Sequence, residues 1–431
     1  MKRAYINANI ITGDASDEVI RDGCIIVNGL GKLAFVGRTN EAALGQLETI
    51  DLKGRYVMPG LINAHIHMFT QGGPVKNMDS KQAAKFMKFL KTRIGQRVMK
   101  KLYAYNTSAF INAGVTTVRD VGSFMNYDLM MKELIEKGEV VGPRIICSGG
   151  IITPTGGHGC EMPGTVVCDG PIEFAKAVRH HYHLKTDWIK ICNTGGVSDA
   201  KYVGEAGMPH MTFEEIQAAC TEAHKRNMMV ASHCESTEGI IDALRAGVDT
   251  IEHGADFDEE IAEMFKNNRK ALRGYTSLIP TLAAAGGLVN NKEKFIDNEG
   301  NRIVLGNAER ISQGCIDGFQ KALKYGVKLG MGTDVSVPNV TAYNTYQELL
   351  LYKDNSDLTN LEIIELATKA NAEVLDIDHL TGCLKVDLDA DFIVLKGNPL
   401  KDLNNIKDPV HVVTRGYFIE KPTYKTVEGV D

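Results

Sequence analysis

This chain has little of what marks nucleic-acid-binding or membrane-binding proteins. Its 431 residues have a formal net charge of only −6, and 24% of them are charged. Nothing in this balance provides the basic surface that binds nucleic acid or the polybasic patch that binds anionic membranes. We therefore expect neither nucleic acid nor a membrane as a partner.

Long apolar runs are also missing. No run approaches the roughly 18–20 residues that a membrane-spanning helix needs. The longest candidate, residues 277–289, is interrupted by Pro280 and by Gly286 and Gly287. The first eight residues lack the apolar core of a signal peptide and lead directly into a strand-like segment.

Regular cysteine spacing is absent as well. The nine cysteines are an odd number, and no two are spaced as Cys-x-x-Cys. Disulfide frameworks and thiolate metal sites usually show even counts or such spacing. We expect free thiols and predict a cytoplasmic location.

What the chain does contain is a long alternation of strand-like and helical segments, typical of parallel βαβ units. Eight strand-like runs occupy residues 57–67, 116–122, 144–150, 187–193, 229–235, 249–253, 274–281 and 327–334. Helices are predicted over 81–112, 126–138, 173–184, 212–226, 236–246, 257–269, 303–325, 342–355 and 360–375. Eight strands, each followed by a helix, predict an α/β fold, namely a (β/α)8 TIM-like barrel.

Both ends of the chain are instead rich in segments typical of β-strands. Strands are predicted over residues 4–12, 23–37, 389–397 and 411–421. We expect residues 1–56 and 384–431 to form a small β-sandwich domain from both termini. Residues 57–383 would then form the barrel domain.

Metal-type ligands stand at the ends of several predicted strands. His65 and His67 end the first run, and side chains two apart on a strand point to the same face, so both imidazoles can reach one metal. His233 and His253 each end a later run, and neutral imidazole is a common metal ligand, although a lone strand-end histidine is more often structural. Asp334 ends the eighth run and can bind a metal, accept a proton from water, or merely cap a helix.

Lys190 lies within a nearly apolar strand, where a charged amine is costly. Burial lowers a lysine pKa, and a neutral amine beside two cations can take up CO2 to form a bridging carbamate. The alternative is a lysine that snorkels or pairs with a carboxylate. Imidazole and carboxylate-type ligands without thiolate suit Zn²⁺, Mn²⁺, Fe²⁺ or Co²⁺, and we expect Zn²⁺.

Taken together, these motifs resemble the amidohydrolase superfamily over nearly the whole chain. The Pro-Gly-Leu-Ile-Asn-Ala-His-Ile-His run, the lysine strand, the two histidine strands and Gly-Thr-Asp334 follow the family's order. Thr-Val-Arg119-Asp, Thr-Gly-Gly-His158-Gly and Ile-Glu-His253-Gly are most similar to its Xaa-Pro dipeptidase (prolidase)-like and imidazolonepropionase-like branch.

The resemblance implies a metal-dependent hydrolase of an amide-type C–N bond in a small-molecule substrate, foremost a dipeptide or an N-acyl amino acid. The alternatives are a hydrolase of cyclic amides, carbamates or ureas, a deaminase, and, more remotely, a non-catalytic scaffold. Mononuclear deaminases of this fold lack the bridging lysine, so Lys190 argues against them. A homo-oligomer is expected because oligomers are common in the family.

The resemblance also implies two divalent ions held by six side chains, which are His65, His67, Lys190, His233, His253 and Asp334. The first histidine pair and Asp334 would hold the more buried ion, and the second pair the other. Lys190, carboxylated by CO2, and a hydroxide would bridge them. Asp334 would act as general base and return the proton to the leaving amine, and His158 would polarise the scissile carbonyl or contact the substrate.

One position departs from the family's pattern. Relatives that bind a substrate carboxylate often carry Tyr two residues after the fifth-strand histidine, where this chain has Glu235. An acidic residue there repels an anionic group and favours a cationic or neutral polar substrate. Arg119 and Tyr202 are expected to be further substrate contacts, with Lys201 and Arg245 as other carboxylate partners.

Overall fold

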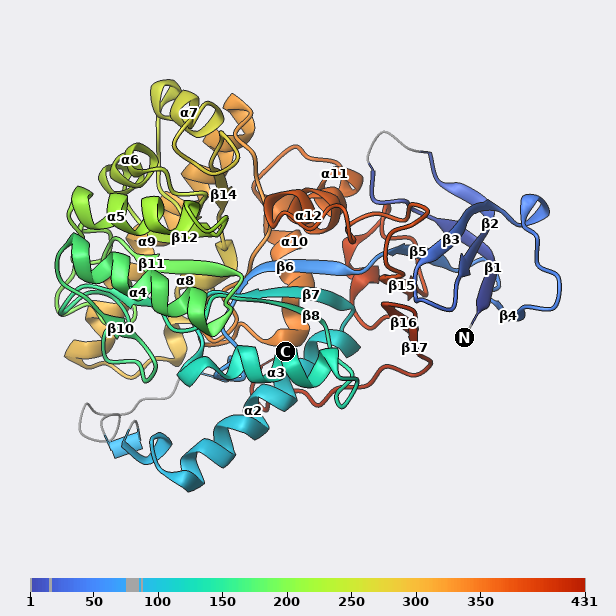
Figure 1. Cartoon of the computed structure of the whole chain (residues 1–431), viewed down its shortest axis with the longest axis horizontal. Helices are drawn as coiled ribbons and strands as arrows, with labels where there is room; N and C mark the ends of the chain where they lie inside the picture. Colours follow the sequence, from blue (N-terminus) through green and yellow to red (C-terminus); the bar gives the residue numbers. More distant parts are fainter. Residues whose placement is uncertain (1, 15–17, 75–84, 87, 431) are drawn as a thin grey trace.

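Strands from both ends of the chain form one mixed sheet in the computed structural model, which describes residues 2–14, 18–74, 85–86 and 88–430. The order is β17-β16-β15-β5-β1-β2-β3, and β4 pairs with β1. The strands are β1 (Arg3–Ile10), β2 (Ile20–Val27), β3 (Leu33–Arg38), β4 (Glu48–Asp51), β5 (Tyr56–Pro59), β15 (Phe392–Leu395), β16 (His411–Thr414) and β17 (Tyr417–Ile419). Figure 1 shows this sheet at one end of the molecule, where strands from the N-terminal and C-terminal parts of the chain lie side by side.

The middle of the chain forms two parallel sheets with helices between the strands, which confirms the α/β class. One sheet has the order β6-β7-β8, and the other has the order β10-β9-β11-β12-β13-β14. Their bounds are β6 (Leu61–Ile66), β7 (Val115–Asp120), β8 (Arg144–Cys147), β9 (Ile152–Thr153), β10 (Val166–Val167), β11 (Trp188–Cys192), β12 (Met229–Cys234), β13 (Thr250–His253) and β14 (Ser277–Ile279). Within the described residues, the strand pairing gives these two sheets and not the single closed ring that the sequence predicted.

The predicted eighth strand, 327–334, is present as an irregular segment between the two sheets. On one side, Gly330 N–H donates to Leu278 O of β14 (3.0 Å). On the other side, the N–H of Ala64 on β6 donates to Met331 O (2.9 Å). It forms only isolated bridges, because Gly330 and Gly332 lack the side chains that stabilise a regular strand.

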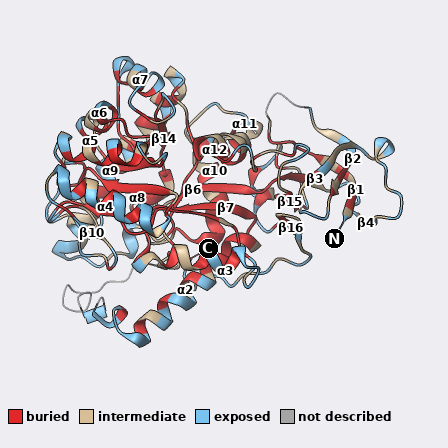
Figure 2. Ribbon diagram, in the orientation of Figure 1, coloured by how far each residue is buried: buried red, intermediate tan, exposed pale blue. Residues whose placement is uncertain are grey.

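Helices cover the outer faces of these sheets, and Figure 2 shows buried strands beneath helices whose outer sides are exposed. They are α2 (Arg93–Asn112), α3 (Tyr127–Glu136), α4 (Pro171–Leu184), α5 (Phe213–His224), α6 (Thr237–Ala246), α7 (Glu259–Lys266), α8 (Leu282–Val289), α9 (Glu299–Tyr325), α10 (Thr345–Asp354), α11 (Asn360–Glu365) and α12 (Asn371–Val374). No helix within the described residues is long and apolar enough to cross a membrane.

Local capping explains where several helices begin. α5 starts with a capping box, in which the Thr212 hydroxyl and the Glu215 carboxylate each accept a backbone N–H of the other residue. Within the helix predicted over 81–112, residues 85–86 and 88–90 are helical, and α2 begins after a break at the Thr92 cap; residues 81–84 and 87 lie outside the described part of the chain. α8 was not predicted, because its sequence is almost entirely apolar and contains two adjacent glycines, which is atypical of a surface helix.

The inner core sets the direction of the strand-end side chains. Trp188, Met229 and Ala231 belong to one buried cluster between the parallel strands. Side chains two positions apart on a strand point to the same face. Lys190 therefore points inward like Trp188, and His233 points inward like Met229 and Ala231.

In β6, the candidate ligands point inward only because the strand pairing is irregular. Ala64 packs in this inner cluster, whereas Ile66 packs in the larger core with the helices. The register of β6 against β7 shifts between Asn63 and Ile66. This shift turns His65 and His67 inward, where regular alternation after Ala64 would direct them toward the helices.

A prediction concerns the contact between β8 and the segment that leads into β15 of the terminal sheet. Arg144 donates to Asp389 (2.7 Å) and to Asp391 (3.1 Å), whose side chain is only 1% exposed. We expect Arg144→Met to destabilise the protein by about 3 kcal/mol, because it removes the cation that pairs with the buried Asp391 carboxylate. The thermal midpoint should fall by several degrees, whereas Lys137→Met, which removes an exposed helical pair with Glu133, should leave it unchanged. Equal midpoints for Arg144→Met and the wild type would contradict this role.

Candidate metal centre

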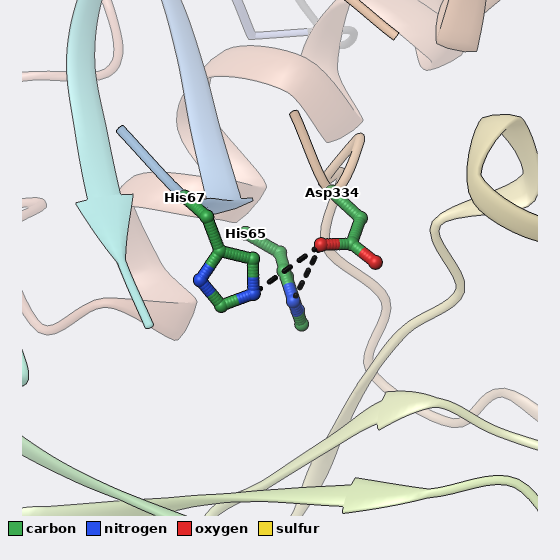
Figure 3. A group of neighbouring side chains, drawn as sticks. All are labelled: His65, His67 and Asp334. Carbon is green, nitrogen blue, oxygen red and sulfur yellow. Dashed lines mark ion pairs between the residues drawn. The ribbon is translucent and has the colours of Figure 1, made fainter. Parts of the chain in front are cut away.

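A first ligand trio consists of His65, His67 and Asp334 (Figure 3). The two histidines come from the end of β6, and Asp334 comes from the end of the irregular eighth segment. Asp334 Oδ1 lies 3.5 Å from His65 Nε2 and 3.4 Å from His67 Nε2. His65 is buried and its Nε2 has no hydrogen-bond partner. Three possible metal-ligand atoms therefore converge at one buried point.

Hydrogen bonds on the far side of each ring direct these nitrogens inward. His65 Nδ1–H donates to Glu252 Oε2 (2.6 Å), and His67 Nδ1–H donates to the Gly122 carbonyl (3.0 Å). Both Nε2 atoms thereby present a lone pair on the side that faces Asp334, as a shared metal ion requires. Metal-binding histidines in proteins are typically held in this way, with the second nitrogen bonded to a carboxylate or carbonyl.

Glu252 is itself held by a fully buried arginine. Arg119 donates to Glu252 Oε1 (2.7 Å), to Thr250 Oγ1 (3.0 Å) and to the Ala64 carbonyl (2.6 Å). Its guanidinium also lies over the Trp188 ring, 4.5 Å from the centroid. Burial alone would raise the pKa of Glu252, but the charge of Arg119 and the His65 hydrogen bond hold this pKa well below its usual range. Glu252 is therefore an anion that fixes the His65 ring.

A second trio, His233, Glu235 and His253, adjoins the first. His233 and Glu235 come from the end of β12 and His253 from the end of β13, and all three are buried. The ring centroids of His65 and His253 are 4.8 Å apart, and those of His233 and His253 are 4.6 Å apart. Lys190, 2% exposed, pairs in register with Ala231 on the neighbouring strand.

Three of these histidines, His67, His233 and His253, are held in the neutral form. Burial lowers the pKa of His67 to about 4, although the charge of Asp334 acts in the opposite direction. Burial and the neighbouring histidines lower the pKa of His233 and of His253 well below the ordinary value. Neutral imidazole is the form that binds a metal.

Two of the candidate ligands have a left-handed backbone. The φ angle is 72° at His253 and 57° at Asp334, a region that residues other than glycine adopt rarely and at a cost of about 1–3 kcal/mol. Beside Asp334, a methyl group added to Gly332 would lie 2.5 Å from the His65 Cβ. The chain thus accepts unfavourable local geometry where these side chains converge.

A cavity of about 640 Å³ opens from the first trio, and His67, His158, Asp199, Lys201 and Asp334 are among its lining residues. The His158 ring stacks on His233 with centroids 4.4 Å apart. His158 Nδ1–H donates to Asp199 Oδ1 (2.7 Å). Burial would lower the pKa of His158, but the hydrogen bond and charge of Asp199 raise it, and His158 in turn lowers the pKa of Asp199 to about 2.

Asp199 was missed in the sequence, although it follows the Gly-Gly-Val-Ser loop after the lysine strand. Two of the residues expected to contact substrate lie elsewhere. Arg119 is fully buried beneath the first trio with its donors used, so we interpret it as a positioning residue. Tyr202 is 51% exposed, and its hydroxyl contacts the Met208 sulfur. Glu235 belongs to the second trio and is not among the residues that line the cavity.

Comparison with known proteins agrees with this geometry. Residues 56–417 match the model of the amidohydrolase family. Among solved structures, a Bifidobacterium longum protein assigned as a prolidase is 32% identical, with 99% of this chain and 96% of that chain covered and a TM-score of 0.85. A Xaa-Pro dipeptidase with methionine bound in its active site is 29% identical, with 97% and 100% covered and a TM-score of 0.84. Ochratoxinase of Aspergillus niger is 26% identical over 96% of this chain and 85% of its own length. The chain therefore belongs to the amidohydrolase family and is a hydrolase that acts on carbon–nitrogen bonds.

Proposed function

We propose that this protein hydrolyses the amide-type C–N bond of a dipeptide or an N-acyl amino acid, with two divalent metal ions held by the two trios. The observation that carries the proposal is the convergence of two adjoining groups of imidazole and carboxyl side chains beside a cavity of about 640 Å³. The similarity to a Xaa-Pro dipeptidase and to a protein assigned as a prolidase supports a dipeptide among the possible amides.

The donor set fits a pair of Zn²⁺ ions. We assign His65, His67 and Asp334 to the first ion and His233 and His253 to the second. Lys190, carboxylated by CO2, would contribute an oxygen to each. When bound, such ions polarise a carbonyl and lower the pKa of the attacking water.

The residues around the ions would move protons and orient the substrate. Asp334 has a carboxylate oxygen at the cavity wall and would accept the proton of the attacking water, then pass it to the leaving amine. His158, held by Asp199, would donate a hydrogen bond to the scissile carbonyl. Lys201 also lines the cavity and is available for a substrate carboxylate.

We also infer that the two parallel sheets close into a TIM-like barrel of residues 57–383. The hydrogen bonds that residues 330 and 331 make to β14 and β6 support this closure. Residues 1–56 and 384–431 would then be the β-sandwich domain. At the carboxyl ends of barrel strands, enzymes of this architecture carry their active sites, which is where the ligand trios lie.

A first prediction concerns metal content. We expect about two divalent ions per chain when the protein is prepared with bicarbonate, and a lower metal content after dialysis in Lys190→Ala, because both ions bind more weakly when the bridging oxygens are lost. Inductively coupled plasma mass spectrometry of the dialysed proteins measures both values. About one ion in the wild type, together with a fully active Lys190→Ala, would contradict the bridged pair.

A second prediction tests the hydrogen bond behind His65. Glu252→Gln should weaken binding of the first ion by about 10–100-fold, because the ring loses its anionic partner. Competition with a chelator measures the affinity, and Glu263→Gln, an exposed change on α7, is the matched control. An unchanged affinity in Glu252→Gln would show that Glu252 does not support metal binding by His65.

A third prediction concerns the reaction itself. A library of dipeptides and N-acyl amino acids should contain a substrate, and Asp334→Asn should lower turnover by about 10³-fold or more, because an amide cannot accept the proton. Asparagine tolerates the left-handed backbone at this position, so the fold should persist. Hydrolysis of cyclic amides, carbamates or ureas without any dipeptide activity would point to the alternative substrate classes.

A further inference from the structure

We propose that Glu235 is a third protein ligand of the metal ion held by His233 and His253. This inference rests on the proposed binuclear function and adds a residue to its second site. It also gives Glu235 a role different from the selection of a cationic substrate that the sequence led us to expect.

The first support is the spacing of the donor atoms. Two ligand atoms bound tetrahedrally to Zn²⁺ at about 2.0–2.1 Å lie roughly 3.3–3.4 Å apart. In the first trio, Asp334 Oδ1 is 3.4 and 3.5 Å from the two imidazole nitrogens. In the second trio, Glu235 Oε2 is 3.5 Å from His233 Nε2. A carboxylate thus stands at ligand distance from an imidazole in both trios.

The second support is an unsatisfied buried oxygen. The Glu235 side chain is 6% exposed, and its Oε2 has no hydrogen-bond partner. By contrast, Glu252 accepts from Arg119, and Glu348 accepts from the N–H groups of Leu282 and Ala283. A buried, unpaired acceptor is unfavourable, and a cation between Glu235 and its histidine neighbours removes this penalty.

The competing contact of His233 is weak. Its Nε2 lies 3.4 Å from the Gly195 carbonyl, a long hydrogen bond that a metal bond can replace. With Glu235, the second site has three protein ligands of its own, none of which depends on Lys190. The second ion should therefore bind even when CO2 is removed and Lys190 is not carboxylated.

The test measures metal binding rather than turnover. Chelator-treated wild type, Glu235→Gln and Glu161→Gln are titrated with Co²⁺ alone in CO2-free buffer, and stoichiometry, affinity and visible absorption are recorded. The control residue Glu161 lines the cavity but belongs to neither trio. We expect two sites in the wild type and in Glu161→Gln, and at least a 100-fold weaker second site in Glu235→Gln with a changed visible spectrum.

The outcomes separate this inference from the function on which it rests. A second site of wild-type affinity in Glu235→Gln would overturn the ligand role, and a shift of KM between cationic and neutral substrates in that variant would return Glu235 to substrate selection. Failure of the wild type to bind any Co²⁺ would instead overturn the proposed function. Should Glu235→Gln not fold, Glu235→Ala replaces it with the same expected loss.

Discussion

The centre of this structure depends on polar ligand atoms that are buried together without partners of their own. His65 Nε2 and Glu235 Oε2 are both buried and unbonded, one in each trio. Lys190 lies in the same interior and is almost completely buried. Burying unpaired polar atoms together is unfavourable in a protein interior without ions, and it becomes favourable when these atoms surround cations. The parallel strands, the shifted register of β6 and the left-handed turns at two ligands all serve to bring these atoms together.

A second layer of contacts keeps this arrangement fixed. One continuous chain of hydrogen bonds runs from Arg119 through Glu252 to His65 and links β7, β13 and β6. Another connects the cavity to the second trio, because Asp199 holds His158 and the His158 ring stacks on His233. Ligand geometry is therefore set by residues that would not touch a metal themselves.

The sequence predicted the α/β class and the six candidate ligands because both follow from short-range patterns. Strand-like runs that end in histidine or aspartate place those side chains at one edge of a parallel sheet. The structure indeed brings His65, His67 and Asp334 into one group and His233 and His253 into another.

The parts that the sequence did not predict depend on contacts between distant segments. Glu252 is 187 positions from its partner His65, and no local pattern connects them. Arg119 resembles a substrate-binding cation in sequence, but the inward row of β7 places it beneath the ligands. In the irregular eighth segment, Gly332 allows the close approach of His65, and Gly330 allows that of Asn371 and Ile279.

The most direct test of the account is a crystal structure with anomalous data collected on both sides of the zinc absorption edge. The account predicts two anomalous peaks, one among His65, His67 and Asp334 and the other beside His233 and His253, with continuous density on the Lys190 amine between them. The absence of peaks at both trios, in crystals of protein that hydrolyses its substrate, would contradict it.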